Sequence, residues 1–102
     1  MGAPRDTTTA MVIIAAGRYV EVRMLCRDGH LAVTEGAGDH EHMFVVTHIP
    51  SGRRAAWFPS LERAKNAMEA VSGMADWSTD EIGRKHLEAR SELARRGGRE
   101  GQ

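Results

Sequence analysis

The stretch HIPSGRRAAWFPSLERAK, residues 48–65, contains a chain reversal, a short strand and the start of a helix. Pro50-Ser51-Gly52 predicts a tight turn, because proline presets φ at the first central position and glycine accepts the positive φ that follows. Ser60 predicts a helix N-cap, since its side-chain oxygen can accept an early backbone N–H. The stretch therefore predicts a hairpin, MFVVTHI to RRAAWF, that leads into a helix over residues 61–72.

Closing this hairpin with Ile49 opposite Arg53 predicts which side chains share a face of the sheet. One face carries Phe44, Val46, Ala56 and Phe58, with His48 and Arg54 at its tip. The other face carries Met43, Val45 and Trp57. A single helix covers only one face, so either Trp77 and a second helix or a partner molecule must cover the other.

The segment YVEVRMLC, residues 19–26, alternates apolar and polar side chains as a half-buried strand does. Its apolar phase is Val20, Val22, Met24 and Cys26, and Glu21 and Arg23 point the other way. Asp28-Gly29 predicts a two-residue hairpin loop that sets Cys26 opposite Leu31 and Met24 opposite Val33. MVIIAA, residues 11–16, is a candidate for a further strand, and the methionines, Met11 included, are interpreted as core gap-fillers.

The two helices carry apolar stripes of different width. The first stripe consists of Leu61, Ala64, Ala67, Met68 and Val71. Ser78-Thr79-Asp80-Glu81 is a capping-box pattern that predicts a second helix from residue 79 to about 96. Its thin stripe is Ile82, His86, Ala89 and Leu93, spaced like a coiled-coil seam. We expect this helix to pair with a second copy, giving a homodimer, or to dock on a partner.

These elements predict an α+β fold: a small antiparallel sheet of three to five strands with one packed helix, then a more exposed C-terminal helix. We expect a disordered N-terminus over residues 1–9 and a sheet-plus-helix domain over 10–77. An amphipathic helix over 78–96 and a disordered tail over 97–102 complete the expected organisation.

Charge and cysteine content restrict the class of protein. Lys plus Arg and Asp plus Glu number 14 each, whereas general nucleic-acid binders are usually basic because phosphate contacts dominate their affinity. The single cysteine, Cys26, allows no internal disulfide, which favours a reducing, cytoplasmic location. No apolar run approaches the roughly 20 residues of a membrane span, so no membrane association is expected.

The pattern of reactive side chains favours a protein that is not an enzyme and that carries no cofactor. No nucleophile, base and orienting group occur in a recognisable arrangement. The phase of Cys26 favours the core over a nucleophile. Asp39-His40-Glu41-His42 is interpreted as a solvated acidic loop with no metal, because zinc needs three or four converging donors at suitable spacing.

The segment FVVTHIPSGRRAAWFPSLERAKNAMEAV, residues 44–71, resembles AP2-type domains and the amino-terminal arm-binding domains of phage integrases. Those families also place a basic turn, a short strand ending in an aromatic residue and a helix after a three-stranded sheet. In them, Arg and Lys on the sheet enter a DNA major groove. The resemblance implies that role for Arg53, Arg54 and Arg23.

Two functions are therefore expected, from different classes. The first is a small protein-binding module, with Arg53, Arg54, Trp57, His48 and Arg23 as its contact residues. Small neutral proteins of this kind are common products of phages and plasmids, and many act by binding a host complex, as anti-CRISPR proteins do. The alternative is a DNA-binding sheet of the AP2 or integrase-arm type.

Overall fold

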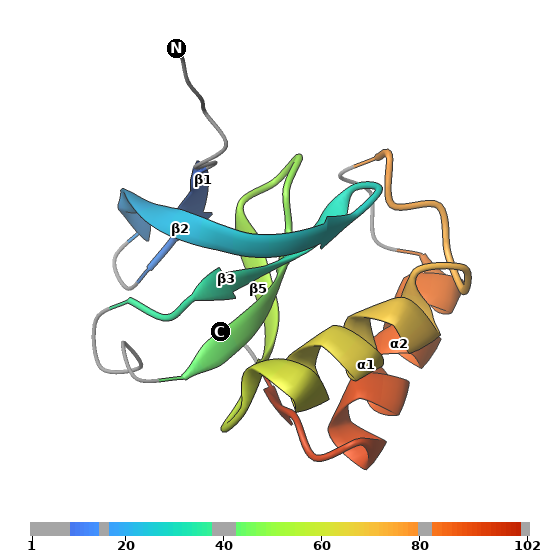
Figure 1. The fold of residues 1–102 in the computed structure, drawn as a ribbon. Coiled ribbons are helices and arrows are strands. Elements are labelled where there is room, and N and C mark those ends of the chain that lie inside the picture. Colours follow the sequence, from blue (N-terminus) through green and yellow to red (C-terminus); the bar gives the residue numbers. More distant parts are fainter. Residues whose placement is uncertain (1–8, 15–16, 38–42, 80–82, 101–102) are drawn as a thin grey trace, which may run out of the picture.

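The structure is a computed structural model, and it describes residues 9–14, 17–37, 43–79 and 83–100. Six strands occur within these ranges, and they lie side by side in chain order with every neighbouring pair antiparallel (Figure 1). They are β1 (Thr9–Ile13), β2 (Tyr19–Asp28), β3 (Leu31–Glu35), β4 (Phe44–His48), β5 (Arg53–Phe58) and the two-residue β6 (Arg99–Glu100). With two helices, this confirms the α+β fold.

The sheet curls until its first strand meets the turn between β4 and β5. The backbone N–H of Ile13 donates to the carbonyl of Gly52 at 2.8 Å. The curl creates a concave face that no helix covers, and its side chains are nevertheless buried. The buried residues of this concave face are Ala10, Val12, Val22, Ala32, Thr34, Val45, Thr47, Arg54 and Trp57. The chain itself therefore covers the second sheet face, and neither of the covers expected from sequence is needed.

Both helices lie together on the opposite, convex face (Figure 1). The first, α1 (Leu61–Val71), begins at the expected N-cap, where Ser60 accepts the N–H of Arg63 at 3.2 Å. Four of its five stripe residues are buried, but Leu61 is 40 % exposed. A helical side chain leans toward the helix N-terminus, so a leucine at the first position leans past the packed surface.

The second helix, α2, spans Arg84–Arg95, so the expected start at residue 79 is wrong. Gly83 is its N-cap, and the Gly83 N–H donates to Nδ1 of His86 at 3.0 Å. His86 thus has the role that Glu or Gln has at the third position of a capping box. Ala89 and Leu93 are 0 % and 1 % exposed in the same core as α1, so the core does not end at the expected boundary after residue 77.

Two β-bulges change the expected strand registers. In the first hairpin the loop is Gly29-His30, so Asp28 lies opposite Leu31, and a bulge follows between Met24 and Cys26. The shifted loop sets Cys26 opposite Val33 instead of Leu31, and the bulge then sets Met24 opposite Thr34 instead of Val33. Cys26 therefore lies on the other face of the sheet from Val22 and Met24, with which it was expected to share a face. An extra residue in one strand shifts the register of everything beyond it by one.

The second hairpin shows the same effect nearer its turn. Val46–Ala56 and Phe44–Phe58 pair as expected, and Gly52 has the expected positive φ of 75°. A bulge then intervenes, so that Thr47 lies opposite Arg54 and His48 lies opposite Arg53. Arg53 and Arg54, which lie between the bulge and the turn, consequently point to the opposite faces of the sheet from those expected.

The chain ends also differ from expectation where they are described. Thr9 belongs to β1, and Arg99 pairs with Trp57 at the end of the sheet. The expected disordered tail over residues 97–102 is therefore wrong up to residue 100. Residues 1–8 and 101–102 lie outside the described ranges.

Candidate binding surface

The two arginines after Gly52 lie on opposite faces of β5. Arg53 is exposed at the hairpin tip, whereas Arg54 is 8 % exposed on the concave face. The guanidinium carbon of Arg54 lies 5.0 Å from the centroid of the Trp57 ring. Its Nε and Nη1 have no hydrogen-bond partner among the residues that the structure describes, and burial lowers the pKa of Arg54. The prediction that Arg54 is a freely exposed contact residue is therefore wrong.

His48 and Trp57, the other two contact residues expected on this hairpin, are buried at 7 % and 2 % exposure. Nε2 of His48 donates to the carbonyl of Trp77 at 2.8 Å, and Nδ1 lies 2.7 Å from the hydroxyl of Ser51. These bonds tie the β4–β5 turn to the segment between the two helices. His48 and Trp57 are thus buried within the chain, where their side chains support the fold.

The stripe expected to form an oligomer interface is buried within the single chain. His86 is 8 % exposed, and its Nε2 donates to the carbonyl of Asp76 at 2.8 Å. Its ring meets Trp77 edge-on, with centroids 4.8 Å apart. Together with buried Ala89 and Leu93, His86 anchors α2 to the chain's own core. Ile82 lies outside the described residues, and the other three positions are not free to pair with a second copy.

Arg23 remains at the surface, as expected. Its Nε lies 3.8 Å from a carboxylate oxygen of Glu35, and both side chains are well exposed, at 61 % and 45 %. An exposed pair of this kind contributes little to stability, so Arg23 stays available for contacts. The three arginines that a DNA-reading sheet would present together are nevertheless divided, since Arg54 lies inside the curl.

A surface that the contact residues expected from sequence did not include lies on the outer side of β1 and β2. Tyr19 is 56 % exposed and Met11 is 51 % exposed. Ile13 pairs with Tyr19 across the two strands, and Met11 lies two residues before Ile13, so the three side chains share one face. Gly52 adjoins them, because a Cβ at that position would lie 3.1 Å from Cε1 of Tyr19. We call Met11, Ile13, Tyr19 and Gly52 the Tyr19 patch.

The sequence contained a signal for this patch. Tyr19 has the same alternation phase as Glu21 and Arg23, which places it on the outer face from the start. Met11 was expected to fill a gap in the core. Only the pairing of β1 with β2 shows that Met11 lies beside Tyr19 while Val12 points inward, at 1 % exposure.

Positive charge borders the patch. Arg18 precedes Tyr19, Arg53 follows Gly52, and both side chains are exposed. Within the described part of the chain, neither arginine forms an ion pair. Glu21 lies opposite Met11 on the same face, and its carboxylate accepts a hydrogen bond from the hydroxyl of Thr9. The patch is therefore an apolar area bordered by two arginines without an ion pair among the described residues and by one acid, Glu21, opposite Met11.

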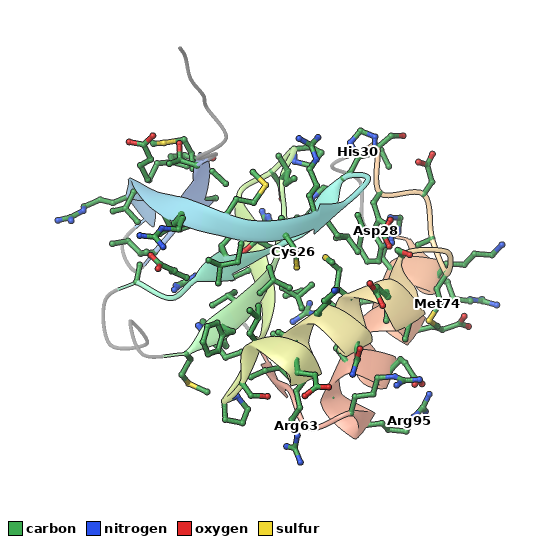
Figure 2. The ribbon with its side chains drawn as sticks, in the orientation of Figure 1. Cys26, Asp28, His30, Arg63, Met74 and Arg95 are labelled. Atoms are coloured by element: carbon green, nitrogen blue, oxygen red, sulfur yellow. The ribbon has the colours of Figure 1, made fainter. Side chains whose placement is uncertain are left out.

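Reactive groups do not gather elsewhere on the described surface. No three His, Cys, Asp or Glu side chains within the described ranges are placed to hold a metal ion, and the acidic loop over residues 39–42 lies outside those ranges. Cys26 is half-buried between the sheet and α1 (Figure 2). None of the helices in the described ranges combines the length and apolar character that crossing a bilayer requires.

Comparison with known proteins supplies no relative: no protein-family model, no curated protein and no solved structure matches this chain.

Proposed function

We propose that this chain is a non-enzymatic protein-binding module, and that it binds an apolar, acidic surface of a protein partner through the Tyr19 patch. The main support is that two large apolar side chains, Tyr19 and Met11, are each more than half exposed on one face of the β1–β2 pair. Inhibition of a host complex is one form that such binding takes.

The composition of the patch supports this proposal. Tyrosine, methionine and arginine are enriched in protein interfaces, and tyrosine and arginine often dominate their binding energy. Tyr19 supplies the aromatic ring, Met11 an adaptable apolar side chain, and Arg18 and Arg53 the charged rim. A tyrosine also loses little conformational entropy when it is immobilised, because it has only two side-chain torsions.

The strands beneath the patch are packed on their other side and hydrogen-bonded to the β4–β5 turn. Val12 and Val22, which point away from the patch, are 1 % and 8 % exposed on the concave face. The bond from Ile13 to Gly52 joins β1 to the β4–β5 turn directly beneath the exposed side chains. These contacts restrain the backbone that carries the exposed side chains, and such restraint lowers the entropic cost of binding.

The charge of the rim favours an acidic partner. An Arg guanidinium can form two parallel hydrogen bonds to one carboxylate, and Arg18 and Arg53 have no such acid among the described residues. DNA would also present negative charge. However, the chain has no net charge, and Arg54 is buried, so the observations favour a protein over a duplex.

The test begins with capture of partners from native lysate, with and without nuclease, by the tagged wild-type chain. Three variants serve as comparisons: Tyr19→Ala with Met11→Ala, Arg53→Glu, and Leu87→Ala. Leu87 is a matched control because it is 53 % exposed but lies on α2, away from the patch. A captured protein is then titrated against each purified variant.

We expect one nuclease-resistant partner to bind the wild type and Leu87→Ala equally. The Tyr19–Met11 double variant should bind at least tenfold more weakly, or about 1.4 kcal/mol, with an unchanged melting temperature. Arg53→Glu should also weaken binding, because it places a like charge against the acidic partner. Capture that nuclease abolishes, with a log–log salt slope near −0.9 per phosphate contact, would instead support DNA binding.

A further inference from the structure

We infer that the concave face holds a small oxyanion, a carboxylate or a phosphate, bound by the guanidinium of Arg54. Arg54 is 8 % exposed, and its Nε and Nη1 are both buried without a hydrogen-bond partner. No carboxylate among the described residues pairs with it. A buried charge of this kind is costly unless a counter-charge accompanies it.

Two threonine hydroxyls lie on the same concave face as Arg54. Thr47 lies directly opposite Arg54, and its hydroxyl lies 2.9 Å from that of Thr34, also on the concave face. The two hydroxyls have two protons, and their mutual bond uses one of them. Both threonines are 0 % exposed. The polar side chains of this face therefore offer several hydrogen-bond donors, and no negatively charged acceptor is described among them.

The residue type fits an oxyanion. A guanidinium is a planar fork that matches the two oxygens of a carboxylate or the edge of a phosphate, whereas a lysine offers a single point charge. The indole of Trp57 supports the guanidinium from one side, with 5.0 Å between the Arg54 Cζ and the ring centroid. This contact occupies one face of the guanidinium, so a ligand would bind at the edges of the fork, where Nε and Nη1 are covered in this structure.

Access to the site follows from the way the curl closes. The strand β1 closes the concave face, and the bond from Ile13 to Gly52 joins it to the turn that precedes Arg54. Since Nε and Nη1 are both covered, an anion must displace the guanidinium or move β1 to reach them. We therefore expect binding to be slow to exchange and sensitive to the packing of β1.

The test uses the full chain and two sodium salts, acetate and phosphate, each compared with sodium chloride at equal ionic strength. Melting temperature is measured for the wild type, Arg54→Met, Arg54→Lys and the exposed neighbour Arg53→Met. The side-chain Nε–H resonance of Arg54 is followed by nitrogen-edited NMR in the wild type, which requires no mutation. At ten times its Kd, a bound anion should raise the melting temperature by roughly 5 °C.

We expect acetate or phosphate to raise the melting temperature of the wild type and of Arg53→Met, and to shift the Arg54 Nε–H resonance. Arg54→Met should lose the response, and Arg54→Lys should bind at least tenfold more weakly. A response to acetate alone would identify a carboxylate site, and one to phosphate a phosphate site. An equal response in Arg54→Met would show an adventitious ion only, and no resonance shift would show a guanidinium satisfied by water; either result overturns the inference.

Discussion

Arg54 stacks on Trp57 inside the curl of the sheet, with its guanidinium carbon 5.0 Å from the centroid of the indole ring. A desolvated cation–π contact of this kind contributes about 2 kcal/mol. Removing an isolated charge from water costs several kcal/mol even after the protein relaxes. In the absence of a bound anion, the free-energy cost of burying Arg54 should therefore exceed the stabilisation from its contact with Trp57.

The first prediction follows from that difference. In chloride buffer, Arg54→Met should be as stable as the wild type or more stable by up to about 3 kcal/mol, because methionine keeps the apolar stem and removes the charge. Urea unfolding measures the difference in stability, provided that the m-value, the dependence of the unfolding free energy on urea concentration, is the same for both proteins. Arg53→Met, at the exposed neighbouring position, should change stability by less than about 0.5 kcal/mol. A loss above 1 kcal/mol in Arg54→Met would show that the stacking outweighs the burial.

A second prediction concerns the seam between β1 and the β4–β5 turn. Gly52 has a φ of +75°, and a Cβ there would lie 2.8 Å from the carbonyl oxygen of Met11. A backbone atom cannot move aside as a flexible side chain does. Gly52→Ala should therefore lower the free energy of unfolding by about 2–4 kcal/mol. Gly29 is the matched control, since its φ is +64° but nothing lies within 4 Å of its Cβ position.

Gly29→Ala should therefore lower the free energy of unfolding by only roughly 1–2 kcal/mol, the cost of placing a side chain in the left-handed conformation. Chemical denaturation of both variants gives the comparison, and the excess loss in Gly52→Ala measures the contact with β1. Losses of equal size would mean that β1 does not pack against the turn in solution.

A third prediction tests whether α2 belongs to the core of the single chain. Leu93 is 1 % exposed and Leu87 is 53 % exposed in the same helix. Leu93→Ala should cost about 2–5 kcal/mol, whereas Leu87→Ala should stay within about 0.5 kcal/mol. Sedimentation equilibrium accompanies the unfolding curves. If Leu93→Ala dissociated a dimer without lowering the stability of the monomer, the helix would be an interface after all.

A fourth prediction concerns pH and the segment after α1. The hydroxyl and backbone N–H of Ser78 both donate to a carboxylate oxygen of Asp76, and these bonds lower the pKa of Asp76 below its ordinary value of 3.8. A carboxyl whose pKa is lower in the folded state stabilises that state above its unfolded pKa. The stabilisation is lost as the pH falls through the folded pKa.

The variant Ser78→Ala removes the hydroxyl bond and should raise the pKa of Asp76 toward 3.8. It should be less stable than the wild type at neutral pH, and the two should converge in acid. Carboxyl-detected NMR titration and urea unfolding at several pH values measure these effects. Ser72→Ala is the control, because Ser72 donates to a backbone carbonyl of Glu69 and its effect should not vary with pH. A pH-independent effect of Ser78→Ala would contradict the prediction.

Local sequence determined the elements of this protein and several of their ends. Alternation over residues 19–24 gives β2 its inner and outer sides as far as the bulge, Gly52 gives the turn its positive φ, and Ser60 begins α1. Each of these features depends on residues within a few positions of one another. Strand alternation, turn geometry and capping are short-range effects, so the sequence alone is sufficient to predict them.

Tertiary structure decided which predicted side chains reach the surface. A single bulge between Thr47 and Val46 in the β4–β5 pairing turns Arg54 from the expected face to the concave one, while Arg53 stays exposed. Bulges depend on how a whole strand fits its neighbours, and the curl that brings Ile13 to Gly52 depends on the accumulated twist of five strands. The Tyr19 patch and the buried Arg54 both follow from these long-range fits, which no local pattern in the sequence encodes.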